Sequence, residues 1–381
     1  LHRKEHSFPT RRSSDLCILW LNKATYKMNN QRYKSTGKKS LFDKQFSSEK
    51  LEEIGNPLAM ISKVIDFEMF RYLLESKLLN SNKKNNAGAK PYDVVLMFKI
   101  LILQRYYGLG DKQVEYQILD RTSFKNFLGL DTADKIPDEK TVWAFRENLT
   151  KTGLTEDLFI QFKNFLETKA LILNEGQMID ASFTVAPRQR NTREENEKIK
   201  NGEGDDLWND KPHKKRHKDI DARWTKKNNE KFYGYKNHAK VDSKSKFINT
   251  FVVTSASVHD SQATEDLLTE KDKGQELYAD SAYTGKNQEK TIAKYEMVNK
   301  VHEKGYRDNP LTDDQKKNNT EKSKTRARVE HVFGFMEQSM NGLKLKSVGI
   351  IRATSIIGLI NLTYNLFRYE QVMRLNLISI K

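Results

Sequence analysis

Residues 177–183 read QMIDASF, a run in which Asp180 is the only charged residue. In a β-strand, alternation places the residues on either side of Asp180 on one face and its carboxylate on the other, beside Met178 and Ser182. A charge in a mostly apolar strand needs compensation. Taken alone, a helix cap or an ion pair with an arginine would explain this aspartate as well as a catalytic role would.

Two further stretches place acidic residues in comparable positions. Residues 276–285 read ELYADSAYTG, a strand-like run with Asp280 near its end, just before a turn. Residues 324–340 read KTRARVEHVFGFMEQSM, a predicted helix with Glu330 beside its apolar face and Arg326 one turn earlier. Carboxylates at adjacent strand ends can share a metal ion, whereas the Arg326 and Glu330 spacing alone indicates an ordinary surface ion pair.

The periodicity of apolar residues changes along the chain. From about residue 49 to 170 it is helical, and within that region residues 108–130 and 136–149 predict two short helices, a glycine-containing turn and a third helix that starts near Pro137 and Asp138. Either a helix-turn-helix DNA reader or a plain helical bundle fits this pattern. From Gly176 the runs QMIDASFTV, FYGYKNHAKVD, FINTFVVTSASV and ELYADSAY predict strands, with helical segments after the third and fourth.

Composition narrows the function classes. The 381 residues carry a formal net charge of +16, with 37% hydrophobic residues, which indicates a folded chain that binds a polyanion, with nucleic acid as the leading candidate. The longest apolar stretch, residues 349–367, is interrupted by arginine, threonine and asparagine, which suits a buried helix rather than a membrane span. Cys17 is the only cysteine, so the sequence excludes an internal disulfide and a cysteine-based metal site.

Together the motifs resemble the DDE transposases of bacterial insertion sequences, in the fourth- and fifth-numbered families. The resemblance runs from about Lys39 to Phe367 and depends on the order of its motifs, which include SLFDKQF, IGNPL, IDASF, FYGYKNHAKVD, TSASVHDS, YADSAYTG and RARVEHVFG. The three acids are spaced as in that family, with 100 positions from Asp180 to Asp280 and 50 from Asp280 to Glu330.

The resemblance implies an α+β protein: a helical N-terminal domain followed by a ribonuclease H-like mixed α/β catalytic domain with charged insertions. It implies metal-dependent cleavage and strand transfer of DNA ends, with Asp180, Asp280 and Glu330 as catalytic residues and ligands of two Mg²⁺ ions, for which Mn²⁺ can substitute. Hard cations such as Mg²⁺ prefer oxygen ligands. A family signature has tyrosine and lysine where this chain has Ser323 and Glu337, so the DNA contacts of those two positions are not carried over.

Basic and aromatic residues around these motifs are candidate DNA contacts. Residues 211–227 read KPHKKRHKDIDARWTKK, in which Trp224 is placed either to stack on an unpaired base or to anchor the segment to the sheet. The alternative of a zinc site at His213 and His217 lacks further ligands. The predicted DNA-binding residues are Arg326, Lys236, His238, Lys214, Lys215, Arg216, Lys218 and Trp224.

The expected organisation has five parts. Residues 1–27 contain HSFPTRRSSDL, which resembles translated sequencing adapter, and are expected to be a disordered artefact before a natural start at Met28. A basic arm (28–48), a helical DNA-end-binding or dimerisation domain (49–172), the catalytic domain (173–372) with insertions at about 187–230 and 307–324, and a tail (373–381) follow.

The predicted partners are double-stranded DNA, as transposon terminal inverted repeats and target DNA, and a second copy of the chain in a homodimer on DNA. No membrane partner is expected, and the predicted location is the bacterial cytoplasm in association with the nucleoid. Two alternatives stay open: an inactive or domesticated DNA-binding protein, and a DDE nuclease that cuts DNA without joining it.

Overall fold

The computed structural model describes residues 40–79, 90–227 and 229–378. The chain divides into two compact units, Leu1–Ile54 and Gly55–Lys381. In the described part of the first unit, helix α2 (Asp43–Ile54) exposes most of its side chains. The predicted artefact of residues 1–27 and most of the predicted basic arm lie outside the described residues.

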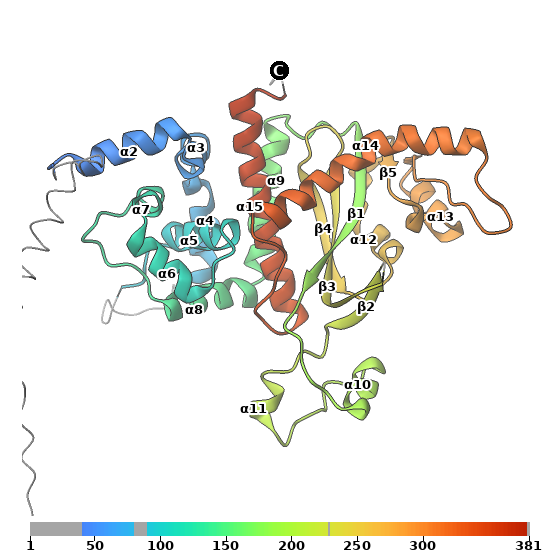
Figure 1. Cartoon of the computed structure of the whole chain (residues 1–381), viewed down its shortest axis with the longest axis horizontal. Coiled ribbons are helices and arrows are strands. Elements are labelled where there is room, and N and C mark those ends of the chain that lie inside the picture. Colours follow the sequence, from blue (N-terminus) through green and yellow to red (C-terminus); the bar gives the residue numbers. More distant parts are fainter. Residues whose placement is uncertain (1–39, 80–89, 228, 379–381) are drawn as a thin grey trace, which may run out of the picture. The chain divides into compact units, whose positions relative to one another are not determined.

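The second unit begins with helices, which confirms the helical prediction for the described residues of this region (Figure 1). Helix α5 is buried on nearly every side, and Asp93 caps its start by accepting hydrogen bonds from the backbone N–H groups of Val95 and Leu96. The helices are α3 (Pro57–Val64), η2 (Phe67–Phe70), α4 (Arg71–Leu78), α5 (Val94–Tyr106), α6 (Asp111–Asp120), α7 (Thr122–Leu128), α8 (Glu139–Lys151) and α9 (Leu154–Thr168).

Helices α6, α7 and α8 are the two short helices and the third helix that the sequence predicts. Gly129 ends α7 in the left-handed conformation with φ 74, and Asp138 caps α8 by accepting a hydrogen bond from Thr141 N at 2.8 Å. Local turn and cap chemistry therefore sets these boundaries.

A six-stranded mixed sheet follows in the described residues, with strand order β2-β3-β1-β5-β6 and β4 paired to β3. Strand β1 is antiparallel to β3 and parallel to β5, so a crossover connects the two parts of the sheet. The four strands predicted from the sequence are present, while β2 and β6 were not predicted. The strands are β1 (Gly176–Val185), β2 (Arg223–Lys227), β3 (Glu230–Asp242), β4 (Ile248–Ser255), β5 (Glu276–Tyr278) and β6 (Val298–Asn299).

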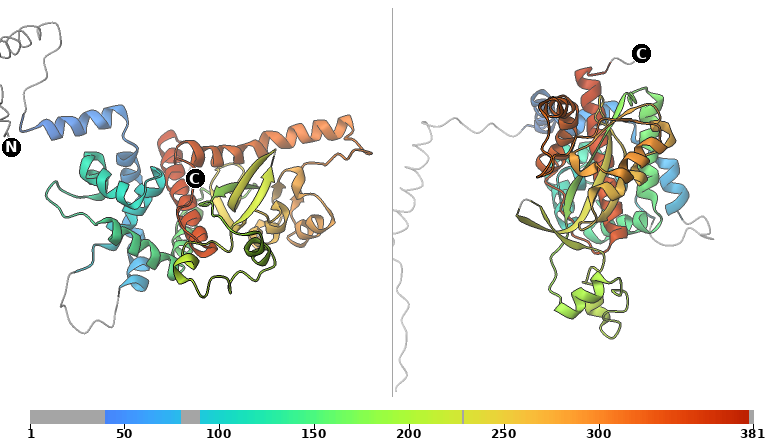
Figure 2. Two further views of the ribbon diagram at one scale, coloured as in Figure 1. Left: turned by 60° about the horizontal axis from the view of Figure 1, so that its bottom comes forward. Right: turned by 90° about the vertical axis from the view of Figure 1, so that its right-hand side faces the viewer.

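Both faces of the sheet are covered. Met178 belongs to the larger core cluster, which includes helices α14 (Asp313–Gln338) and α15 (Ile350–Leu375), and neighbouring Ile179 belongs to a smaller cluster with residues around α12 (Thr264–Leu267) and α13 (Lys286–Lys294). Figure 2 shows α14 and α15 as long helices that meet beside the sheet. The predicted fold class, a helical N-terminal region followed by a mixed α/β domain, is confirmed.

Helix α15 is long and apolar enough to cross a membrane, yet 78% of its apolar window is buried in the fold. Its asparagines make buried hydrogen bonds to the sheet. Asn361 exchanges amide hydrogen bonds with Asn237 at 2.8 and 3.2 Å, and Asn365 pairs with both backbone groups of Ile248 at 2.9 and 3.0 Å. These polar residues are satisfied inside the protein, and α15 is a core helix, as predicted.

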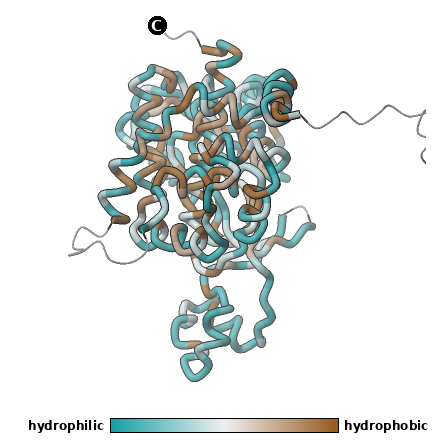
Figure 3. Tube along the Cα trace, turned by 90° about the vertical axis from the view of Figure 1, so that its left-hand side faces the viewer, coloured by the Kyte–Doolittle hydropathy of each residue, from teal (hydrophilic) through white to brown (hydrophobic). Residues whose placement is uncertain are grey.

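The first predicted insertion leaves the end of β1 and carries α10 (Arg193–Lys200) and α11 (Pro212–Lys215). Figure 3 shows this segment as predominantly hydrophilic. Its return to the sheet is fixed by buried Asp219, which accepts hydrogen bonds from the Tyr235 hydroxyl at 2.8 Å and from Gly349 N at 3.0 Å.

Two segments predicted to lie outside the main elements are partly helical. Residues 307–324 were expected to be an insertion in the catalytic domain, and most of them form the first half of α14, which begins with a capping box between Thr312 and Gln315. Ion pairs at spacing i,i+3, such as Lys316 with Asp313 at 3.0 Å, support the exposed turns of this helix. The predicted tail at 373–381 is likewise helical at its start, because α15 continues to Leu375.

Candidate active site

The strand pairing brings the two aspartates to the same edge of the sheet. Strands β1 and β5 run parallel with Met178 opposite Tyr278, and each aspartate follows two residues later. Asp180 continues within β1, whereas Asp280 leaves β5 and caps the short helix η5 (Ser281–Tyr283) by accepting a hydrogen bond from Ala282 N at 2.8 Å. The fold thus brings together two carboxylates that are 100 positions apart in the sequence.

Glu330 approaches the pair from α14, which packs against β1 and β5. The buried residues Val329, Val332 and Phe333 fix the rotation of the helix, so that Glu330 lies beside the buried face. The Glu330 side chain is 57% exposed, whereas that of Asp180 is 18% exposed.

Arg326 lies between the helix and the strand. Its Nη2 donates a hydrogen bond to Glu330 Oε1 at 2.6 Å, and its Nη1 lies 3.6 Å from Asp180 Oδ2. One guanidinium therefore contacts two of the three predicted catalytic acids, which holds Glu330 toward the arginine rather than toward the aspartates.

Negative charge is concentrated where the two aspartates meet. The pKa of Asp180 is raised to about 6, mainly by burial; the nearby charge of Asp280 adds to the shift, and the hydrogen bond from Ala181 N and the charge of Arg326 oppose it. Burial also raises the pKa of Tyr283 well above its usual value, with Asp180, Asp260 and Asp280 adding to the effect. Clustered carboxylates attract a cation, and the attraction is stronger in an apolar environment than in water.

Two neighbours of the acids, Tyr283 and His302, were not predicted from the sequence. The Tyr283 hydroxyl is buried with no hydrogen-bond partner among the described residues. Ser323 Oγ lies 3.3 Å from His302 Nε2, and the pKa of His302 is lowered by burial and by Arg326. The DSAY motif contains Tyr283, but no sequence signal distinguishes a tyrosine that lies against carboxylates from one in an ordinary core.

The donor chemistry suits a hard divalent cation, because all three side chains are carboxylates. In the described part of the chain, however, no group of three or more His, Cys, Asp or Glu side chains is gathered so that it could hold a metal ion. Glu330 is instead paired with Arg326, so it would have to release Arg326 to join the aspartates around a metal ion.

Lys236 and His238 are not placed to contact DNA. Lys236 is 7% exposed and donates to Asp260 Oδ1 and to Val258 O, both at 2.7 Å, and His238 is 0% exposed with Nε2 at 2.8 Å from the Thr254 hydroxyl. The prediction that both line a DNA groove is wrong in this structure, because β3 is central in the sheet and both of its faces are covered.

The basic residues of the insertion differ in what they contact. Lys214 pairs with Glu195 at 2.5 Å, Lys215 donates to Asn209 at 2.6 Å, and Lys218 donates to Asn191 at 2.7 Å. Arg216 is exposed and makes no ion pair with any described residue. Trp224 is 49% exposed on β2 and packs against Tyr233 with ring centroids 5.1 Å apart.

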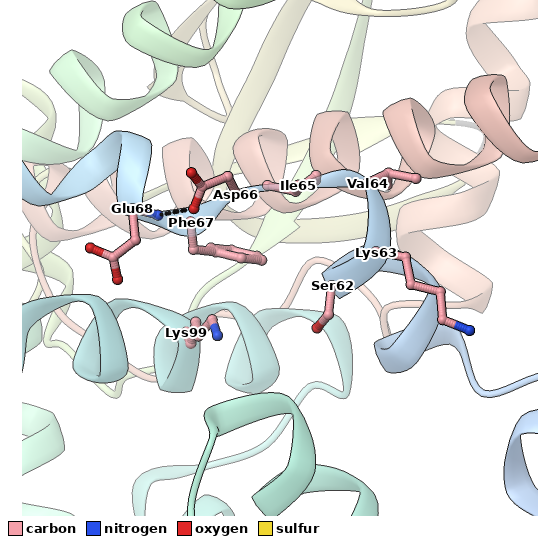
Figure 4. Close-up of a pocket in the computed structure, with 8 residues that line it drawn as sticks. All are labelled: Ser62, Lys63, Val64, Ile65, Asp66, Phe67, Glu68 and Lys99. Atoms are coloured by element: carbon pink, nitrogen blue, oxygen red, sulfur yellow. Dashed lines mark hydrogen bonds between the residues drawn. The ribbon is translucent and has the colours of Figure 1, made fainter. Parts of the chain in front are cut away.

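A pocket of about 430 Å³ lies among the N-terminal helices, between the stretch from Ser62 to Glu68 and Lys99 (Figure 4). Lys99 donates to Phe127 O at 3.0 Å and lies over the rings of Phe67 and Phe127. Its ammonium is thus used in packing, and none of the three predicted catalytic acids lines this pocket.

Comparison with known proteins gives two family matches. Residues 174–366, which are 193 of the 381 residues, match the family described as "Transposase DDE domain", and residues 46–148 match the family described as "Transposase domain (DUF772)". A solved synaptic complex of piggyBac transposase with hairpin DNA is similar over 87% of this chain and 78% of that chain, with 11% sequence identity and a TM-score of 0.43.

Proposed function

Since the chain belongs to the transposase DDE domain family, we propose that Asp180, Asp280 and Glu330 are the acids that support its DNA cleavage and strand transfer. The protein is a transposase, an enzyme that acts on DNA, and its family generally uses divalent metal ions. The observation that carries the residue assignment is the parallel register of β1 and β5, which brings Asp180 and Asp280 together beside a helix that carries Glu330.

The proposed cofactor is a pair of Mg²⁺ ions, with Mn²⁺ as a substitute. Bound to these carboxylates, the ions would activate the attacking water or DNA 3′-hydroxyl and stabilise the leaving oxygen. Asp180 and Asp280 would supply ligands from the edge of the sheet, and Glu330 would complete the set if it released Arg326. The guanidinium would then be available beside the acids as a donor for a DNA phosphate.

The proposed substrates are the terminal inverted repeats of the element and its target DNA, bound by a homodimer in the bacterial cytoplasm at the nucleoid. The net charge of +16 supports a DNA partner. Exposed Arg216 and Trp224 are the residues of the predicted DNA-binding set that are free to contact DNA from the insertion and the sheet edge. The helical region at 49–172 is proposed to bind the ends or to form the dimer.

The test uses a labelled transposon-end duplex with Mg²⁺ or Mn²⁺. We expect D180N, D280N and E330Q to abolish cleavage and joining while retaining end binding, because each change removes a ligand but little DNA-contacting surface. E337Q is the matched control, since Glu337 is an exposed acid on the same helix, and it should keep its activity.

The same assay separates the alternatives. Cleavage without joined products would indicate a nuclease, and binding without any cleavage by the unaltered chain would indicate an inactive DNA-binding protein. Wild-type cleavage by E330Q would show that Glu330 is not one of the essential acids.

A further inference from the structure

A cavity of about 1040 Å³ lies apart from the three acids, none of which lines it. Its walls come from helices α5, α6 and α8, from Arg216 of the insertion, from residues 340–348 and from the start of α15. Segments from the helical region, the insertion and the catalytic domain therefore meet around one space.

The lining of this cavity carries an excess of positive charge. Two of its cations are paired with acids: Arg146 with Asp111 at 2.5 Å and Arg352 with Glu147 at 2.8 Å. Four more cations make no ion pair within the described ranges, and they are Arg105, Arg216, Lys344 and Lys346. Six cations against two acids leave an excess of four positive charges.

Arg105 is the most informative of these cations. Its Nε is buried without a hydrogen-bond partner among the described residues. Burial and the neighbouring charge of Arg146 lower its pKa to about 10, so the guanidinium remains charged at neutral pH. A buried, charged donor without a partner is costly, and an anion in the cavity would relieve that cost.

The two lysines are held in place by backbone pairing. Val185 N donates to Leu343 O, and Leu345 N donates to Val185 O, both at 2.9 Å, which joins this segment to the end of β1. Leu343 and Leu345 are buried, and alternation along the extended segment turns Lys344 and Lys346 to the exposed side. The cations are thus positioned by the sheet that also carries Asp180.

We propose that this cavity binds the sugar–phosphate backbone of the DNA, as a second contact site separate from the catalytic acids. The cations come from several elements around a large space, which suits successive phosphates of a polyanion rather than one small anion. Trp143 lines the same cavity and is 51% exposed, which offers an aromatic face to a sugar or base. The proposal rests on the chain acting on DNA, but it does not depend on the assignment of the three acids.

The test is end binding in EDTA, measured by fluorescence anisotropy over a series of salt concentrations. K344A/K346A should weaken binding by at least about tenfold and reduce the slope of log K against log salt by about 2, because each lost phosphate contact removes released counterions. R216A should reduce the slope by about 1. All three substituted residues are exposed, so these variants should fold.

The matched control is K273A/K290A, which removes two exposed lysines that do not line the cavity. Binding is measured in EDTA without cleavage, so a failure of the catalytic assignment would leave this result intact. Equal losses in K344A/K346A and K273A/K290A would overturn the proposal.

A second arm distinguishes DNA from free phosphate. Inorganic phosphate is exchanged for chloride at equal ionic strength, and the melting temperature is recorded. If phosphate stabilises the wild type but not K344A/K346A while both bind DNA equally, the cavity takes free phosphate and the proposal is wrong.

Discussion

The guanidinium of Arg326 lies 3.6 Å from the carboxylate of Asp180. Its other terminal nitrogen is hydrogen-bonded to Glu330 at 2.6 Å, so a single positive charge bridges the strand and the helix. In the absence of a metal ion, this bridge offsets part of the repulsion among the acids. It also competes with a metal ion for the same oxygens.

The first prediction concerns that competition. R326Q should lower the melting temperature in EDTA, because it removes the cation between Asp180 and Glu330. Added Mn²⁺ should raise the melting temperature more for R326Q than for the wild type, because the ion no longer displaces an arginine. Differential scanning fluorimetry with and without Mn²⁺ measures both effects.

The control for this experiment is R328Q. Arg328 lies on the same helix and donates to Ser243 O at 2.9 Å, so its loss should leave the gain from Mn²⁺ unchanged. An equal gain from Mn²⁺ in R326Q and the wild type would show that Arg326 does not compete with the ion.

The second prediction concerns the order of the insertion. Lys214 and Trp208 Nε1 both bind Glu195, at 2.5 and 2.6 Å, and Lys214 also lies over the Trp208 ring. The hydrogen bonds from Lys214 and then Trp208 lower the pKa of Glu195 to about 2. K214A should therefore loosen α10 and increase proteolytic cleavage within residues 187–222.

Limited proteolysis followed by mass spectrometry locates the cleavage. K198A is the matched control, because Lys198 is an exposed lysine on α10 that makes no ion pair with any residue in the described ranges. Identical cleavage of K214A and the wild type would mean that the contact between Lys214 and Glu195 does not order α10.

The fold was largely predictable because its signals are local. Helical periodicity, the Asp138 cap and the β-branched runs specify elements from neighbouring residues alone. Strand β2 was missed because its sequence, RWTKK, is too charged to resemble a strand; it forms because β3 offers a hydrogen-bonding edge. The first half of α14 was missed for a related reason, since its charged residues pair along the helix and leave no apolar period.

The site was predictable only as a set of residues. Motif order led to the prediction of Asp180, Asp280 and Glu330, whereas Arg326 was predicted only as a DNA contact and in the structure contacts two of these acids. The errors among the predicted DNA contacts come mainly from burial, because the sequence does not distinguish a lysine or histidine of a strand that faces solvent from one that is buried. Lys236 and His238 are covered because β3 is a central strand.

The third prediction tests the strand pairing that carries Asp180. Gly234 has φ +148, and a Cβ there would lie 2.2 Å from Thr184 O on β1. G234A should destabilise the protein by about 3 kcal/mol or more, because backbone rather than a flexible side chain must move. G334A is the control: Gly334 lies inside α14 with nothing near an added Cβ, so alanine should stabilise by up to about 1 kcal/mol. Urea unfolding measures both, and a G234A chain as stable as the wild type would contradict the pairing.

The last prediction concerns the pH dependence of stability. Burial lowers the pKa of His238 to about 4; the charge of Asp260 opposes this shift and that of Lys236 adds to it. Between pH 6.5 and 4 the unfolded chain therefore binds a proton that the folded chain does not. The contribution of neutral His238 is present above pH 6.5 and is lost as the pH falls, by about 3 kcal/mol for a shift of this size.

Asp180 acts with the opposite sign in an overlapping range. Its pKa is raised to about 6, so its contribution is present below about pH 4 and is lost as the pH rises through 6. The two effects partly cancel in the wild type, and each variant should reveal one of them. H238Q keeps a polar group for Thr254 and should gain stability relative to the wild type as the pH falls from 7.5 to 4.5, whereas D180N should gain as the pH rises. Urea unfolding in EDTA at pH 4.5, 5.5 and 7.5 measures these differences. Parallel curves for H238Q and the wild type would mean that His238 titrates alike in the folded and unfolded chains.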